Sequence, residues 1–169
     1  MAVDWADVYR RTYQDLVRFL HRMVWDADRA RDLAQDAFAR ALGQSPDNPR
    51  AWVFRVASNL ANDEARSAIR RRKHLVLIKG EAEARQEAAP DPHDQLEQLE
   101  RVEAVRKALD QLGERDREAL LLWDAGLDYQ DIAAATGLAA GAVGTTLARA
   151  RRRLVEAHDA LEKRHVARK

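Results

Sequence analysis

Apolar residues recur three or four positions apart along almost the whole chain, and the strict alternation of a half-buried strand is nearly absent. The N-terminal stretch shows the pattern clearly, with apolar side chains at Trp5, Val8, Leu16, Leu20 and Val24. This spacing places apolar groups on one face of a helix, which must then pack against other helices. The sequence therefore predicts an all-α protein.

Capping residues and helix breakers divide the chain into separate helices. Gly43 ends the second predicted helix, a loop follows at 44–49, and Asn48 with Pro49 suits the start of a third. In the second half, helix ends are predicted at Gly113, Gly126 and Gly137.

The middle of the chain is rich in acidic residues and contains the breaker segment AAPDPHD. Its two prolines cannot lie inside one continuous helix. We therefore expect two small helical domains, residues 1–75 and 96–169, joined by a flexible acidic linker at 76–95.

The net charge of +1 conceals an uneven distribution of charge along the chain. Residues 66–73 carry five basic side chains and no acid, 81–103 carry eight acids, and 149–169 carry eight basic side chains. Two basic blocks around an acidic connector suggest a polyanion held at two places. Two solvated helix ends would explain the same charges equally well.

Catalytic and membrane classes find little support. There is no cysteine, the five histidines are scattered without metal-ligand spacing, and no glycine-rich phosphate loop follows a strand. We expect no enzyme activity, no cofactor and no metal site. The absence of an apolar run of membrane length and of an N-terminal signal core predicts a cytoplasmic protein without membrane insertion of its own.

Two short helices near the C-terminus have the pattern of a helix-turn-helix. Asp128 caps YQDIAAAT, Gly137 forms the turn, and the following helix ends in RARRRL. The spacing predicts a small core made by Ile132, Ala133, Leu138, Val143 and Leu147. A plain helical hairpin is the alternative.

Four segments in order give a wider resemblance: DRARDLAQDAFARAL, PRAWVFRVASNLANDEARSAIRRRK, ALDQLGERDREALLLWDAGLDYQDIAAATGL and VGTTLARARRRL. Together they resemble the extracytoplasmic-function (ECF) sigma factors of bacterial RNA polymerase. The resemblance implies an initiation factor whose first domain binds the polymerase clamp and the −10 element, and whose second domain binds the −35 element. It also implies an anti-sigma factor as a partner, besides core RNA polymerase and promoter DNA.

Carried over onto this sequence, the resemblance implies three sets of site residues. The polymerase contacts would be Asp32, Gln35 and Asp36, although the two acids also suit the start of a helix by its dipole alone. The −10 contacts would come from the loop 44–50, from Asn59 and Asp63, and from the arginines Arg66, Arg70, Arg71 and Arg72. Trp52 is predicted to lie in the core, whereas Phe54 lies off the apolar face and is a candidate interface residue.

The −35 contacts would be Thr145, Thr146, Arg149 and Arg152 on the final helix. The sequence departs from the family here, because a serine near Ala139, a basic residue at Gly144 and an arginine at Thr146 are missing. Losing one charged base contact costs about 1–3 kcal/mol of discrimination. We therefore expect −35 recognition that is weak, methyl-biased or dependent on a partner.

Two other classes of function remain open. A stand-alone helix-turn-helix regulator would bind duplex DNA tightly without polymerase, and a helical adaptor would bind an acidic protein through its basic blocks. Both leave the N-terminal domain without a purpose, which favours the initiation factor.

Overall fold

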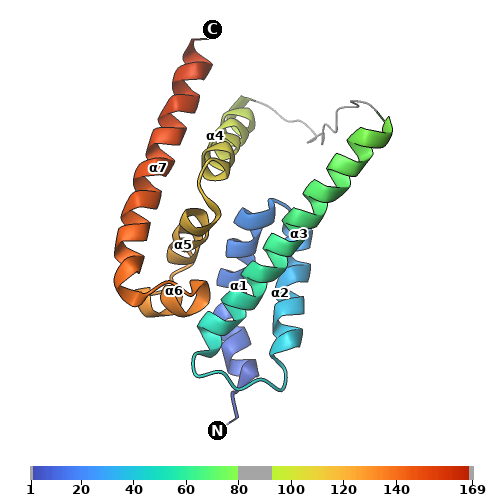
Figure 1. The fold of residues 1–169 in the computed structure, drawn as a ribbon, viewed down its shortest axis with the longest axis vertical. Coiled ribbons are helices and arrows are strands. Elements are labelled where there is room, and N and C mark those ends of the chain that lie inside the picture. The colour runs from blue at the N-terminus through green and yellow to red at the C-terminus, as the bar shows by residue number, and fades with distance from the viewer. Residues whose placement is uncertain (1, 80–92, 168–169) are drawn as a thin grey trace.

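The computed structural model describes residues 2–79 and 93–167, which form helices and connecting turns without a strand. The helices are α1 (Trp5–Val24), α2 (Ala27–Ala41), α3 (Pro49–Lys79), α4 (His93–Asp110), α5 (Glu114–Asp124), α6 (Tyr129–Thr136) and α7 (Ala140–Val166). The all-α prediction is confirmed. Figure 1 shows α1, α2 and α3 side by side, with the other helices grouped beside them.

The first three helices form a bundle in which each helix contacts the other two. Its core contains fully buried side chains from all three, among them Leu16, Leu33 and Val53. Phe54 belongs to this core, so its assignment as an interface residue was wrong. It is completely buried, and its ring meets that of Phe19 edge-on, with the ring centroids 5.4 Å apart.

The predicted capping residues begin their helices. The backbone N–H of Ala51 donates to the Asn48 side chain at 3.0 Å, and the N–H of Asp131 donates to the Asp128 side chain at 2.8 Å. Each cap satisfies one of the free N–H groups that a helix start leaves open. Gly137 ends α6 at a φ of 74°, a left-handed conformation that costs little without a Cβ.

The second half packs α7 against α4, α5 and α6. The helix-turn-helix core is present as predicted: Ile132, Val143 and Leu147 are fully buried, and Ala133 and Leu138 pack against them. The axes of α6 and α7 meet at 94°, which lies in the range of helix-turn-helix motifs.

The two halves of the chain also contact each other. α6 packs against α3 and α5 against α1, and Figure 1 shows α6 beside the N-terminal half of α3. The buried apolar side chains form one cluster with members from both halves. The two helical domains therefore pack against each other.

The helices on either side of the predicted linker at 76–95 extend into it. α3 continues to Lys79 and α4 already begins at His93, while residues 80–92, with both prolines of the breaker segment, lie outside the described residues. The domain boundaries at 75 and 96 remain a prediction.

Candidate nucleic-acid interface

The outward face of α3 carries the side chains that the sequence assigned to the −10 element. Asn59, Asp63, Arg66, Arg70 and Arg71 are all exposed, and their spacing of three to four residues places most of them along one side of the helix. Arg72 lies outside the residues whose side chains the structure describes. This face therefore presents amide, carboxylate and guanidinium groups to solvent.

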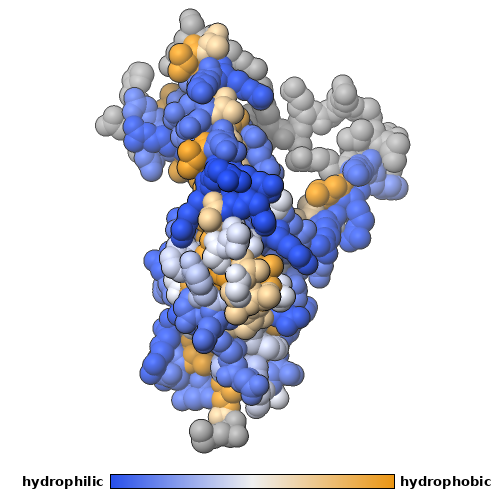
Figure 2. All heavy atoms as spheres, turned by 60° about the vertical axis from the view of Figure 1, so that its left-hand side comes forward, coloured by the Kyte–Doolittle hydropathy of each residue, from blue (hydrophilic) through white to orange (hydrophobic). Residues whose placement is uncertain are grey.

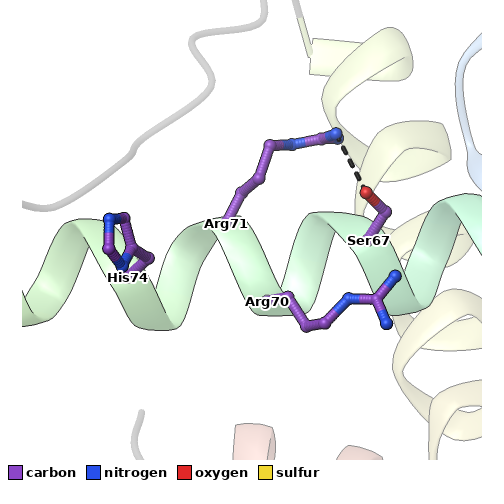
Figure 3. A pocket seen from close by; sticks show the side chains of 4 residues that line it. All are labelled: Ser67, Arg70, Arg71 and His74. Carbon is purple, nitrogen blue, oxygen red and sulfur yellow. Dashed lines mark hydrogen bonds between the residues drawn. The ribbon is translucent and has the colours of Figure 1, made fainter.

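The C-terminal part of this face has a shallow concave surface lined by Ser67, Arg70, Arg71 and His74 (Figure 3). Arg71 turns back along the helix, and its Nη1 donates to the Ser67 hydroxyl at 3.1 Å. In Figure 3 the side chains of Arg70 and Arg71 extend to opposite sides of α3. The two guanidinium groups therefore lie on either side of the helix.

The loop before α3 is tied to the second half of the chain. The Asn48 side chain accepts the cap hydrogen bond of α3, and its Nδ2 donates to Asp131 on α6 at 2.6 Å. Nη2 of Arg50 lies 3.3 Å from the Asp15 carboxylate and 3.4 Å from the Ala125 carbonyl oxygen. The loop expected to read bases is thus occupied by protein groups.

Arg66 is similarly engaged. Its Nη2 lies 3.1 Å from Oε1 of Glu114 on α5, and its Nη1 lies 3.8 Å from Asp63. Two turns earlier, the hydroxyl of Ser58 donates to the carboxylate of Glu118. Ser58 is buried by this contact, although it lies on the helix that carries the exposed Asn59.

The polar face of α2 is open. Asp32, Gln35 and Asp36 are exposed, and Leu33 and Phe38 are buried beneath them, as the sequence predicts. Among the described side chains, none of Arg66, Arg70 and Arg71 forms an ion pair with these three residues. The three side chains form an accessible polar surface on one side of α2.

A carboxylate on α3 fixes the position of α2. Nε of Arg29 donates to both oxygens of Glu64, at 2.6 and 2.8 Å. This hydrogen bond, helped by the nearby carboxylates of Asp32 and Asp36, raises the pKa of Arg29. The ion pair sets the register between the open face of α2 and α3.

Helix α7 presents a neutral surface where the sequence places base readers. Thr145 is exposed, as are Ala140, Gly141 and Ala148. Figure 2 shows this side of the molecule, with a pale patch near the α6–α7 turn and a strongly hydrophilic band above it. The exposed surface of the first turns of α7 offers one hydroxyl and several small apolar groups.

Thr146 differs from the prediction, because it is only 5% exposed. It lies three residues after Val143 and four before Ala150, and both of these are buried, so helical geometry turns Thr146 toward the core. A base contact by Thr146 is incompatible with this packing.

Arg149 is bound to a buried acid. Asp116 on α5 is 3% exposed, and it accepts from Nε of Arg149 at 3.1 Å and from Nη2 at 2.5 Å. Nη1 of Arg153 donates to the same carboxylate at 2.9 Å. The hydrogen bond from Arg149 is the main reason that the pKa of Asp116 is lowered, and it raises the pKa of Arg149 in turn.

The other arginines of this block have different surroundings. The guanidinium of Arg151 lies over the ring of Trp123, 5.3 Å from its centroid. The side chain of Arg152 is 70% exposed, and its nearest acid, Glu156, lies 3.9 Å away. Arg152 is therefore the arginine of this block best placed to meet a phosphate.

Sequence reasoning missed Asp116, although a signal was present. Asp116, Ala119 and Leu122 are spaced by three, which places the carboxylate on the buried side of α5. A carboxylate at such a position needs a cation, and the arginine block on the last helix supplies two.

Two further observations limit the kinds of site present. Within residues 2–79 and 93–167, no group of three or more His, Cys, Asp or Glu side chains is arranged to hold a metal ion. In the same residues no single helix is long and apolar enough to cross a membrane; α6 and α7 meet the composition only as a bent pair.

Comparison with known proteins agrees with this architecture. Residues 8–72 match sigma-70 region 2, and residues 102–154 match sigma-70 region 4. Over 135 residues the chain is 36% identical to the ECF RNA polymerase sigma factor EcfG of Rhodopseudomonas palustris (strain TIE-1), an alignment that covers 76% of this chain and 71% of that protein.

Two solved structures are similar along most of the chain. The sigma factor RpoE in complex with the anti-sigma factor NepR from Bartonella quintana is 27% identical with a TM-score of 0.59, and the match covers 91% of this chain and 96% of that one. CnrH in complex with the cytosolic domain of CnrY is 25% identical with a TM-score of 0.64, covering 92% and 88%.

A bundle that carries region 2 and a helix-turn-helix domain that carries region 4 define a sigma-70-type architecture. The chain belongs to the ECF sigma factors, the alternative sigma factors that direct RNA polymerase to promoters, and this family is not enzymatic.

Proposed function

We propose that the exposed face of α3 binds the separated −10 strand of the promoter. The observation that carries this proposal is the row of exposed groups from Asn59 to Arg71. An amide can hydrogen-bond the edge of an extruded base, because it holds a donor and an acceptor together. Arg70 and Arg71 would bind successive phosphates on either side of the helix, and Asp63 would keep Arg66 oriented, since the two lie 3.8 Å apart.

The open face of α2 would bind core RNA polymerase. Asp32, Gln35 and Asp36 are exposed on successive turns, and their partner surface on the polymerase would be basic. The ion pair between Arg29 and Glu64 holds this face at a fixed angle to α3. Polymerase binding and strand binding would therefore use two faces of one rigid bundle.

Helix α7 would enter the major groove at the −35 element through Thr145, with Arg152 on the phosphate backbone. Its neutral surface predicts contacts with thymine methyl groups and little discrimination by hydrogen bonding. Arg149 would act mainly through Asp116, by fixing the rotation of α7 against α5. The affinity for the −35 element would consequently be lower than that of a recognition helix with several basic side chains at the base-contacting positions.

The partners would include an anti-sigma factor, and the protein would act in the cytoplasm. RpoE of Bartonella quintana is bound by the anti-sigma factor NepR, and CnrH is bound by the cytosolic domain of CnrY. We expect a protein of this kind to cover the polymerase-binding and DNA-binding faces of this chain. The chain has no cysteine, so any thiol-based sensing would reside in that partner.

Run-off transcription with purified core polymerase tests these assignments. Arg70→Ala with Arg71→Ala should reduce open-complex formation and leave polymerase binding unchanged, whereas Asp32→Ala with Asp36→Ala should weaken polymerase binding itself. Arg10→Ala is a suitable control, because this side chain is 66% exposed on α1 and pairs with Asp7 of the same helix, 3.5 Å away. Full transcription by the Arg70/Arg71 variant would contradict the strand-binding assignment.

The stand-alone regulator makes a different prediction in the same experiment. It requires tight, salt-dependent binding of the protein alone to a duplex site, without a complex with core polymerase. An adaptor would bind neither polymerase nor DNA.

A further inference from the structure

We infer that Trp5 positions the loop 44–48 so that this loop can select a base of the −10 strand. The inference rests on the proposed function of the α3 face, because the loop leads directly into α3. Trp5 is the first residue of α1, and its indole Nε1 donates to the backbone carbonyl oxygen of Gln44 at 3.0 Å. The two residues are 39 positions apart in the sequence. A side chain outside the strand-reading face therefore holds the loop.

The indole of Trp5 has a fixed place from which to hold the loop. Its ring packs against that of Trp52 in the first turn of α3, with the ring centroids 5.8 Å apart and the planes tilted by 55°. Both rings also pack against the hydrophobic core. Asp4 caps the start of α1 by accepting from the backbone N–H of Asp7 at 3.0 Å, so the turn that carries Trp5 is fixed as well.

The loop is held at both ends, and the side chains between the two anchors face solvent. At the first end, the N–H of Gln44 donates to the carbonyl oxygen of Ala41 at 2.9 Å, so both backbone groups of Gln44 have partners. At the other end, Asn48 caps α3. The side chains of Gln44, Ser45 and Asp47 are exposed. Their amide, hydroxyl and carboxylate groups are of the kinds that hydrogen-bond base edges.

The bond from Trp5 also sets the direction of a backbone donor. In a trans peptide the C=O of one residue and the N–H of the next point in opposite directions, and none of the described peptide bonds is cis. Because the C=O of Gln44 points at the Trp5 indole, the N–H of Ser45 points away from it. Among the described residues this N–H has no backbone acceptor. Ser45 therefore offers a backbone donor beside its exposed hydroxyl, and both groups are available to a base edge.

The N–H of the indole is the group that matters in this contact. Phenylalanine at position 5 keeps an aromatic ring against Trp52 but has no donor. The peptide group between Gln44 and Ser45 would then be free to turn. The choice of base should suffer while general strand affinity is kept, because contacts of Arg70 and Arg71 with phosphates carry no sequence information. Trp5 is therefore a positioning residue that acts through the loop.

Trp5→Phe tests the inference in the complete holoenzyme, formed from this factor and core polymerase. The probes are promoter fragments with a duplex −35 element and a single-stranded −10 element, taken from a promoter that the holoenzyme transcribes. Each −10 position is varied over the four bases, and discrimination is the ratio of the affinities for the best and the worst base. Trp5→Phe should lower this ratio by about threefold to tenfold at one position, as expected for the loss of one hydrogen bond, and leave the other positions unchanged.

Trp52→Phe is the matched control, because it makes the same chemical change in the other ring of the pair. Among the described residues, the hydrogen bonds that hold the loop do not involve the Trp52 indole. This variant should lower the midpoint of thermal unfolding about as much as Trp5→Phe does, without a change in discrimination. Hydrogen exchange measured by mass spectrometry gives a second readout, since the loop amides should exchange faster in Trp5→Phe alone.

The outcomes separate this inference from the proposed function. Unchanged discrimination in Trp5→Phe would show that the held loop does not select the base, whether or not its amides exchange faster. An equal loss of discrimination in both variants would assign the effect to ring packing and not to the indole N–H. In either case the inference falls and the strand-binding role of α3 stands. Full strand affinity in Arg70→Ala with Arg71→Ala would instead overturn the proposed function, whatever the result for Trp5.

Discussion

Arg149 of α7 donates two hydrogen bonds to the carboxylate of Asp116 on α5. Its Nε lies 3.1 Å from Oδ2, and its Nη2 lies 2.5 Å from Oδ1. The carboxylate is buried, so it cannot exchange this partner for water. Because Arg153 binds the same group, two turns of α7 are fixed to one point on α5. The rotation of the recognition helix therefore depends on an acid that never faces DNA.

Asp116→Asn should lower the free energy of unfolding by about 2 kcal/mol. The amide has the size of the carboxylate but carries no negative charge for the two guanidinium groups. Binding to a −35 duplex should weaken as well, since α7 is no longer held at one rotation. Chemical denaturation and fluorescence anisotropy measure the two effects. Asp159→Asn, an exposed acid on α7, should change neither.

The effect of Asp116 should depend on pH with a defined sign. The pKa of this carboxyl is lowered in the folded protein, mainly by the hydrogen bond from Arg149. Its contribution to stability is therefore complete above the pKa of the unfolded chain and is lost as the pH falls through the folded pKa. The stability difference between wild type and Asp116→Asn should be largest near neutral pH and shrink on acidification. A constant difference would contradict the assignment.

Glu118 should show the opposite dependence. Its pKa is raised, chiefly by burial and further by Glu114, against lowering effects of the Ser58 hydroxyl, Arg117 and Arg115. The folded protein therefore favours the protonated carboxyl, and this contribution to stability is lost as the pH rises through the raised pKa. Glu118→Gln should raise the midpoint of thermal unfolding at neutral pH, because the amide carries no charge into the buried position. The difference from wild type should vanish in acid.

Local sequence signals predicted most of the fold. Asn48, Asp128 and Gly137 act through neighbours within four residues, so capping and turn rules apply to them directly. The buried core of the helix-turn-helix followed from helical spacing alone. Thr146 was misassigned because the resemblance took precedence over that same spacing, which places it between Val143 and Ala150.

Contacts between the halves could not be predicted. Arg66 and Glu114 are separated by 48 residues, and Ser58 and Glu118 by 60. Each of these four side chains is an ordinary polar residue on its own helix. The periodic pattern of the sequence does not indicate which acid pairs with which donor. These pairings depend on how two helical surfaces fit together, which is a property of tertiary packing.

Substitutions of Phe54 test whether this ring stabilises the core or contacts DNA. Phe54→Ala should cost about 3–5 kcal/mol of stability, because a fully buried ring against Phe19 is removed. The milder Phe54→Leu should keep strand binding while lowering the midpoint of thermal unfolding. Arg55→Ala, at the exposed neighbouring position, should change stability by less than about 0.5 kcal/mol. Loss of strand binding at full stability in Phe54→Leu would instead place this ring in the interface.

Gly144 tests whether the neutral surface of α7 limits −35 recognition. A Cβ at this position would lie 3.4 Å from Cε2 of Tyr129, so a methyl group fits beside the ring. Gly144→Ala should stabilise the helix by about 1 kcal/mol. Gly144→Lys adds a cation as well, and should tighten binding to a −35 duplex by about tenfold.

The matched control for added charge is Ala160→Lys, which places the same cation on an exposed position four turns further along α7. Fluorescence anisotropy with the −35 duplex and with a scrambled duplex separates specific from general attraction, because only general attraction acts on both. Gly144→Lys should favour the −35 duplex, whereas Ala160→Lys should leave the ratio unchanged. An equal gain on both duplexes in both variants would mean that the missing basic residue is not what limits −35 recognition.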